Sequence, residues 1–175
     1  RGGRSQKACR PTSHIAQTGV MRILLKLELD CAVDAAWRAI RSPDVFRAVS
    51  APFTTFESLE PGGFPDSWPE GEHLVRGRAF GVAVIGEQTI DLAFLELRGG
   101  VRAVRDTGRG LSGPLALVNS WEHTMAVSPL PGARTLFRDQ LKVEAGLLTP
   151  LLWVGFWAFW QWRSIQLKRL SPDWK

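Results

Sequence analysis

The segment Leu147–Leu170, LLTPLLWVGFWAFWQWRSIQLKRL, decides how the rest of the chain can fold. It contains four of the eight Trp and two of the nine Phe of the protein. Its apolar part, Leu147–Trp160, is about fourteen residues long, whereas a helix that crosses a bilayer needs about 20. Thr149 is a candidate cap and Pro150 a candidate first-turn residue. We therefore expect a long C-terminal helix and no transmembrane span.

The first three turns of this helix are apolar on nearly every side, which is not typical of a surface helix. Other elements are therefore expected to cover it on most sides. At helical spacing, four aromatic residues form one stripe: Trp153, Phe156, Trp157 and Trp160. A packed core explains this stripe, and the wall of an internal cavity is compatible with the same burial.

The rest of the chain supplies a sheet as the cover. Arg22–Asp30, RILLKLELD, alternates apolar and charged residues as a half-buried strand does. Two short helices are expected next, one with Asp34 as its candidate cap and one after the interruption at Ser42 and Pro43. Six further strand-like runs are separated by turns rich in Gly and Pro: Phe53–Leu59, Glu72–Phe80, Gly86–Leu97, Val101–Thr107, Leu117–Val127 and Arg134–Glu144. The pattern predicts one α+β domain with about seven strands.

The positive charge of the chain is concentrated at its start. The formal net charge is +5, and residues 1–20 contain four basic and no acidic side chains. The remaining residues are nearly neutral, which argues against a nucleic-acid-binding surface. We expect residues 1–20 to form a flexible basic N-terminal extension and residues 21–175 to form the domain.

Cysteine and histidine are too few and too scattered for a disulfide framework or a metal centre. Cys9 and Cys31 are accompanied by no CxxC motif and no secretory signal, so we expect free thiols and a cytoplasmic location. The three histidines stand far apart, at positions 14, 73 and 123. No nucleotide-binding or nucleophile motif is present. We therefore expect no metal and no cofactor.

The order of these elements, together with four pieces of sequence, resembles the SRPBCC superfamily. The pieces are VDAAWRAIRSPDVF (33–46), WPEGEHLVRGRAFG (68–81), NSWEHTMAVSPLPGARTLFRDQLKVEAG (119–146) and FWQWRSIQLKRL (159–170). The resemblance covers about Arg22 to Leu170. It implies a helix-grip fold, with a curved antiparallel sheet wrapped around the C-terminal helix, as in START lipid-transfer domains, the birch-pollen allergen family and polyketide cyclases. It also implies a cavity between sheet and helix for lipids, polyketides, sterols or other hydrophobic molecules.

Strand alternation places a histidine and an aspartate on the inner face of the last hairpin. His123 shares a face with Trp121 and Met125, and Asp139 shares one with Phe137. A tight turn pairs positions whose numbers add up to about 262, which sets His123 opposite Asp139. The carboxylate favours the imidazolium and fixes its tautomer. Three interpretations stay open: a buried pair joining two strands, an anchor for a ligand head group, or a general acid/base.

Two arginines leave the inner face of their strand ambiguous. Arg76 and Arg78 share a face with Phe80, whereas His73 and Val75 form the rival inner face. On an inner face, two guanidiniums suit a carboxylate or phosphate head group. On an outer face they are solvated. Arg163, on the C-terminal helix, is expected at the cavity mouth or in an ion pair with a loop carboxylate.

The function expected from these features is binding or transport of a small hydrophobic ligand, with no catalysis or at most weak catalysis. The candidate ligand-binding residues are Arg76, Arg78, Phe80, Trp121, His123, Met125, Phe137, Asp139, Trp153, Phe156, Trp157 and Trp160. One alternative is an enzyme of the polyketide cyclase/dehydratase type, in which His123 and Asp139 are the catalytic residues. Another is an interaction module, in which the Trp-rich helix contacts a second copy in a homodimer or the edge of a membrane.

Overall fold

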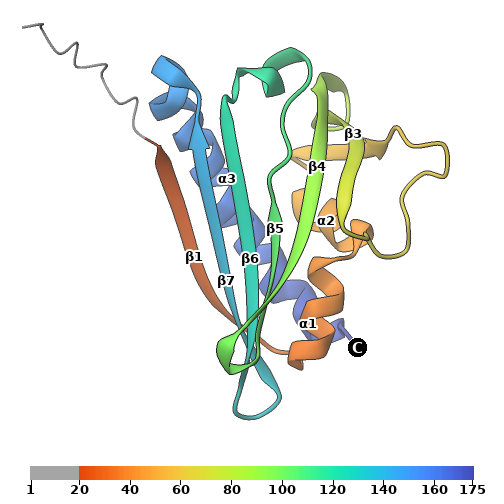
Figure 1. The fold of residues 1–175 in the computed structure, drawn as a ribbon, viewed down its shortest axis with the longest axis vertical. Helices are drawn as coiled ribbons and strands as arrows, with labels where there is room; N and C mark the ends of the chain where they lie inside the picture. Colours follow the sequence, from red (N-terminus) through yellow and green to blue (C-terminus); the bar gives the residue numbers. More distant parts are fainter. Residues whose placement is uncertain (1–19) are drawn as a thin grey trace, which may run out of the picture.

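The computed structural model describes residues 20–175 (Figure 1). The predicted basic extension lies outside the described residues, apart from Val20. In chain order the main elements are β1 Met21–Leu29, α1 Val33–Ile40, α2 Pro43–Ser50, β2 Thr54–Ser58, β3 Gly71–Ala79, β4 Ala83–Leu97, β5 Val101–Asp106, β6 Ser120–Leu130, β7 Arg134–Glu144 and α3 Thr149–Leu170. Short 3-10 turns, η1 Arg98–Gly100, η2 Gly113–Leu117, η3 Gly146–Leu148 and η4 Ser171–Asp173, complete the path. The predicted α+β class is confirmed.

The seven strands form one antiparallel sheet in the order β1-β7-β6-β5-β4-β3-β2. The sheet curves in front of α3, and α1 and α2 lie beside that helix (Figure 1). The two short helices connect β1 and β2, which are the two edge strands of the sheet. The predicted architecture, a curved sheet around a long C-terminal helix, is confirmed.

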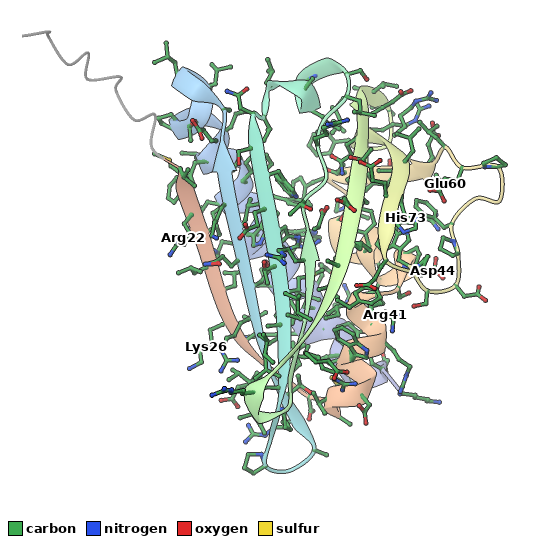
Figure 2. All side chains as sticks on the ribbon, in the orientation of Figure 1. Arg22, Lys26, Arg41, Asp44, Glu60 and His73 are labelled. Carbon is green, nitrogen blue, oxygen red and sulfur yellow. The ribbon has the colours of Figure 1, made fainter. Side chains whose placement is uncertain are left out.

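Alternation along β1 separates the inside of the sheet from its outside. Ile23 and Leu27 are buried, whereas Arg22 and Lys26 are exposed and project away from the sheet (Figure 2). This is the pattern of a strand with one face on a core and the other in water. The predicted half-buried strand is confirmed.

Two strands begin three residues away from their predicted starts, whereas the other strands begin within one residue of them. β6 begins at Ser120 and not at Leu117, because the preceding residues form the 3-10 turn η2 after Pro114. β4 begins at Ala83 and not at Gly86, because its pairing with β3 continues past a register shift. Such a bulge bends the strand at the end of the sheet.

The two residues expected to cap helices, Asp34 and Thr149, have other roles in the structure. Asp34 lies in the first turn of α1, two residues after the capping position Ala32, and accepts a hydrogen bond of 2.6 Å from Arg102 on β5. Thr149 is the first residue of α3. Its Oγ1 accepts from the Ala145 amide at 2.8 Å and donates to the Gly146 carbonyl at 2.7 Å. The hydroxyl therefore holds the turn that leads into α3 and does not cap the helix.

The sheet covers α3 on one side only, in its first half. Trp160 is buried against β1 and β7, with Ile23 and Leu141. On the opposite side Leu151 is 72% exposed and Trp157 is 47% exposed. The expectation that this helix is covered on most sides is therefore wrong for its N-terminal half. Among the helices of residues 20–175, none combines the length and the apolarity that crossing a bilayer requires.

Candidate ligand-binding cavity

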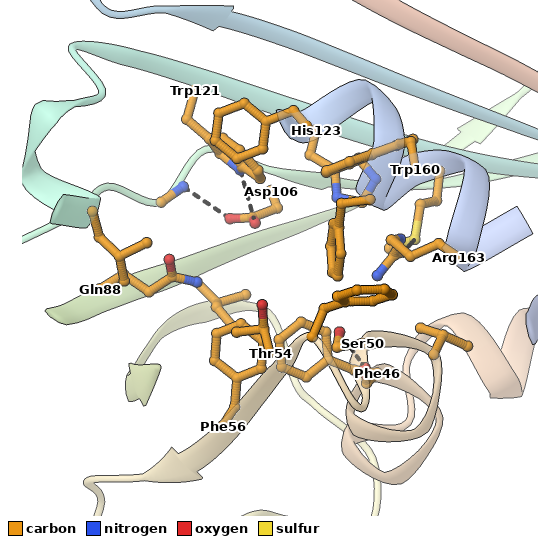
Figure 3. Close-up of a pocket in the computed structure, with 18 of the residues that line it drawn as sticks. Phe46, Ser50, Thr54, Phe56, Gln88, Asp106, Trp121, His123, Trp160 and Arg163 are labelled. Atoms are coloured by element: carbon orange, nitrogen blue, oxygen red, sulfur yellow. Dashed lines mark hydrogen bonds between the residues drawn. The ribbon is translucent and has the colours of Figure 1, made fainter. Parts of the chain in front are cut away.

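A cavity of about 710 Å³ lies between the inner face of the sheet, α2 and α3 (Figure 3). Its volume is within the range of small-molecule sites in proteins. The wall is mostly apolar and draws on α1, α2, β2, β4, β5, β6 and α3. The lining residues that are themselves exposed mark the side on which the cavity opens: Phe53, Arg109, Leu151, Gly155, Ala158 and Ile165.

The loop between β5 and β6 forms part of the rim because it lies directly on β4. The Thr89 amide donates to the Arg109 carbonyl at 2.9 Å, and the Leu111 amide donates to Glu87 at 2.7 Å. Gly86 has φ +130°, and a Cβ at this position would lie 1.9 Å from the Ser112 carbonyl oxygen. Only glycine permits so close an approach of two backbones, so the sequence sets the position of the rim here.

Five of the predicted ligand-binding residues line the cavity: Trp121, His123, Met125, Phe156 and Trp160. Trp153 and Trp157, predicted on the same helical stripe, do not. Trp153 is turned towards β1, where its indole N–H donates to the Arg22 carbonyl at 3.3 Å. Trp157 points outward. Successive residues of a helix are rotated by about 100°, so a cavity on one side meets only part of an aromatic helix.

The two predicted residues of β7 lie behind the cavity wall. Phe137 has no exposed surface and belongs to the solid core, between Leu27 of β1 and Val127 of β6. Asp139 is 1% exposed and is not among the lining residues. Neither is placed to touch a ligand directly.

Of the two faces of β3 that alternation left open, the inner one carries His73 and Val75, which are both buried. Arg76 and Arg78 are on the outer face, and Phe80 is 64% exposed at the turn into β4. None of these three predicted ligand-binding residues lines the cavity. The inner face is the apolar one because arginines are rarely buried unless they are paired.

The two arginines instead connect the outer surfaces of three neighbouring strands. Arg76 lies 2.9 Å from Glu57 of β2 and 2.8 Å from Glu87 of β4. Arg78 lies 3.5 Å from Glu57. All four side chains are about one-third exposed or more, so each ion pair contributes little to stability.

His123 and Asp139 make contact, but not from opposite positions. His123 is opposite Leu141, and Asp139 is opposite Met125, so the predicted register is wrong by two residues. A register shift of two residues keeps every side chain on the same face of the sheet. As diagonal neighbours, His123 Nε2 and Asp139 Oδ1 lie 2.8 Å apart. A histidine held in this way at a cavity wall has the geometry of a polar anchor and also of a general acid/base.

Two side chains of α3 complete a buried polar cluster around Asp139. The Trp160 indole N–H donates to Asp139 Oδ1 at 2.9 Å. Arg163 Nη2 lies 3.8 Å from Asp139 Oδ2, and Arg163 is only 5% exposed. Arg163 was expected at the mouth or against a loop carboxylate. It lies instead inside the molecule, lines the cavity and faces a strand carboxylate.

Comparison with known proteins identifies the architecture. No family model and no curated protein sequence matches the chain. Solved structures do match. A protein from Chromobacterium violaceum has a TM-score of 0.59 at 19% identity, over 86% of this chain and 97% of that one. The Zhui aromatase/cyclase from Streptomyces has a TM-score of 0.61 at 15% identity, over 89% and 95%. Norcoclaurine synthase from Thalictrum flavum, with dopamine and hydroxybenzaldehyde, has a TM-score of 0.58 at 16% identity, over 98% and 99%.

The chain has the helix-grip fold. Within residues 20–175 of this helix-grip domain, no three His, Cys, Asp or Glu side chains come together as metal ligands. The cavity wall carries four side chains that can be charged, namely Asp106, Arg109, His123 and Arg163.

The pKa values of the charged groups inside the helix-grip domain are shifted by burial and by neighbouring charges. Burial alone would raise the pKa of Asp139. The charge and hydrogen bond of His123, the charge of Arg163 and the Trp160 N–H outweigh it and hold this pKa below its ordinary value. Burial lowers the pKa of Arg163, against the opposing charge of Asp139. We therefore treat Asp139 as ionised and Arg163 as a cation.

Asp106 is a second buried carboxyl group, which strand alternation did not single out. Its Oδ1 accepts from the amides of Asp91 and Gly108 at 3.0 and 2.9 Å, and its Oδ2 accepts from the Trp121 indole at 3.2 Å. Burial raises its pKa above the ordinary value, although these donors and the charge of His123 act in the other direction. Its hydrogen bonds tie the rim loop to β4, β5 and β6.

The two buried carboxyl groups predict opposite contributions to acid stability. Because the pKa of Asp139 is lower in the folded state, the unfolded chain takes up this proton first. The stability due to Asp139 is therefore present above pH 3.8, its ordinary value, and is lost as the pH falls through the folded pKa. In thermal unfolding between about pH 5 and pH 2, Asp139→Asn should show a shallower acid loss of Tm than the wild type.

Asp106→Asn is the control, because its effect on the acid loss of Tm should have the opposite sign. Because the pKa of Asp106 is raised in the folded state, the folded protein takes up this proton first and gains stability as the pH falls. Removing the group should make the acid loss of Tm steeper. Parallel profiles for the two variants and the wild type contradict the assignment.

Proposed function

We propose that the protein binds or transports a small hydrophobic ligand inside its internal cavity. The observation that carries this proposal is a mostly apolar hollow of about 710 Å³ that the aromatic side chains of α3 do not fill. A structural neighbour, norcoclaurine synthase, was solved with dopamine and hydroxybenzaldehyde. The helix-grip fold is therefore compatible with small aromatic molecules.

The apolar wall can supply most of the affinity. Removal of about 300 Å² of apolar ligand surface from water contributes about 7 kcal/mol, at about 25 cal/mol per Å². Part of this free energy is offset by the translational and rotational freedom that the ligand loses on binding. Binding in the micromolar range corresponds to about 8 kcal/mol. Burial of the apolar surface together with a few polar contacts is enough to give micromolar affinity.

Filling the cavity tests this function directly. Gly155 lines the cavity on its open side and is exposed, and a Cβ placed on it meets no atom within 4 Å, so a large side chain fits there and covers the opening without moving the backbone. Gly155→Trp is expected to weaken binding of the neutral fluorescent probe N-phenylnaphthylamine by about ten-fold or more, which corresponds to about 1.4 kcal/mol. Fluorescence titration of the purified protein measures it.

Val154→Trp is the matched control, because Val154 is the adjacent residue, is 57% exposed and does not line the cavity. Its probe affinity should equal that of the wild type. Equal affinities for all three proteins mean that the probe binds elsewhere and that the proposal is wrong. In the same titration His123→Ala should keep probe binding within a few-fold, since apolar burial dominates. If the protein is instead a cyclase-type enzyme, this variant retains binding but loses turnover.

A further inference from the structure

Arg163 is a buried cation whose capacity for hydrogen bonds is largely unused. A guanidinium carries five N–H donors. Within the described residues, the one hydrogen bond of this side chain is a contact of 3.8 Å from Nη2 to the sulfur of Met125. Nε is buried and has no partner. Burying a charged group without hydrogen bonds costs several kcal/mol, so this arrangement calls for an acceptor.

Asp139 balances the charge of Arg163 but does not satisfy its donors. The closest approach, 3.8 Å from Nη2 to Oδ2, is too long for a hydrogen bond. Oδ1 of the same carboxylate already accepts from His123 and Trp160. Trp160 contributes its ring, whose centroid lies 5.4 Å from the guanidinium carbon. The guanidinium is thus positioned by its neighbours while its donors remain available.

The open side of Arg163 is the cavity. Figure 3 shows its nitrogen atoms directed towards the space between Trp160, His123 and Phe46. Of the other charged residues in the wall, Asp106 is engaged by three N–H donors and Arg109 lies on the exposed rim. The nearest protein acceptor without a partner, Asp139 Oδ2, lies 3.8 Å from Nη2, so a molecule in the cavity can supply the close acceptor that Arg163 lacks.

We propose that the ligand is an amphiphile with an anionic oxygen head group, such as a carboxylate, which is bound by Arg163 inside the cavity. This inference rests on the proposed function and adds the chemical class of the ligand to it. A carboxylate matches the planar arrangement of guanidinium donors and accepts two parallel hydrogen bonds. The apolar part of the ligand then extends along α3.

The position of Arg163 along α3 sets the orientation of the ligand. Leu151, at the opening, and Arg163 are separated by about 18 Å along the helix axis, at about 1.5 Å per residue. Between them the helix presents the apolar residues Leu152, Phe156 and Phe159 to the cavity. A head group bound at Arg163 therefore meets a buried side chain, and the apolar tail follows this row of residues towards Leu151.

Three probes with one tail and different heads test the inference: dodecanoate, 1-dodecanol and dodecylammonium. Each is titrated below its micellar concentration at pH 8, with Trp fluorescence and calorimetry as readouts. The wild type should bind dodecanoate about ten- to hundred-fold more tightly than 1-dodecanol, as expected for charge-assisted hydrogen bonds. Dodecylammonium should bind most weakly, because its charge repels the guanidinium.

Arg163→Met removes the charge and keeps a side chain of similar length. It should abolish the preference for dodecanoate and leave 1-dodecanol binding within about three-fold of the wild type. Because this change leaves Asp139 unbalanced, the double variant Asp139→Asn with Arg163→Met is the variant that preserves the fold. It should behave in the same way. Asp139→Asn alone should increase the preference, since the carboxylate no longer competes for the guanidinium.

Arg109→Met is the matched control, because Arg109 is the other arginine in the cavity wall and lies on the rim. It should retain the wild-type preference. If Arg109→Met loses the preference and Arg163→Met keeps it, the head group binds at the rim and the inference is wrong. Equal binding of dodecanoate and 1-dodecanol to the wild type also overturns it, while the hydrophobic-ligand function stands. Binding of none of the three probes argues against the proposed function itself.

Discussion

Replacing Asp139 by Ala is expected to lower the free energy of unfolding by about 3–5 kcal/mol, as for other buried ion pairs that lose one partner. The carboxylate is 1% exposed, accepts hydrogen bonds from His123 and Trp160 and faces Arg163. Its removal leaves a buried guanidinium without a counter-charge and two buried N–H groups without an acceptor. Urea unfolding at pH 7, followed by far-UV circular dichroism, measures the loss.

Asp139→Asn distinguishes the contribution of charge from that of hydrogen bonding. The amide oxygen of Asn can still accept from Trp160, so this variant should lose less than Asp139→Ala. If Asp139→Ala is unfolded in buffer, Asp139→Asn still gives a measurable transition. A loss below about 1 kcal/mol in Asp139→Ala, which is the scale of an exposed ion pair, contradicts the buried cluster described above.

Replacing Phe137 by Ala is expected to cost about 3–5 kcal/mol through the loss of packing alone. The ring has no exposed surface and lies between Leu27 and Val127 of the neighbouring strands. Because Phe137 is in the solid core and not in the wall of the ligand cavity, the remaining folded protein should still bind N-phenylnaphthylamine with wild-type affinity. Urea unfolding and probe titration measure the two effects on one sample.

Leu24→Ala is the control for this packing argument. Leu24 lies on the same sheet, in β1, but is 63% exposed, so Leu24→Ala should lower the free energy of unfolding by about 0.5 kcal/mol or less. If Phe137→Ala also lowers the free energy of unfolding by so little, the core around β7 is not closely packed and the prediction is wrong. A large loss of probe affinity in Phe137→Ala shows that the ligand reaches this part of the core.

Strand periodicity could predict which side chains face inward, because alternate residues point to opposite faces. This placed His123 and Asp139 on one face although the pairing was wrong by two residues. Turn length is harder to read from the sequence. The segment from Pro131 to Ala133 makes the turn, with Gly132 and Ala133 at positive φ, and the strands pair right up to it.

The faces of α3 could not be predicted in the same way. A helix that is apolar all round does not show in its sequence which side meets the sheet. Trp157 and Trp160 were therefore predicted on one stripe, whereas the first is exposed and the second is buried. The depth of Arg163 depends on how α3 crosses β7, which local pattern does not encode. The same holds for Asp106, whose three partners come from separate segments.

The pairing of the first strand with the last one has a consequence for biosynthesis. Cys31, just after β1, accepts a hydrogen bond from Thr135 of β7, 104 residues later in the chain. β1 therefore leaves the ribosome long before β7, its one sheet neighbour among residues 20–175, exists, and its apolar face stays uncovered meanwhile. Contacts between residues so distant in sequence slow folding and prolong exposure to aggregation.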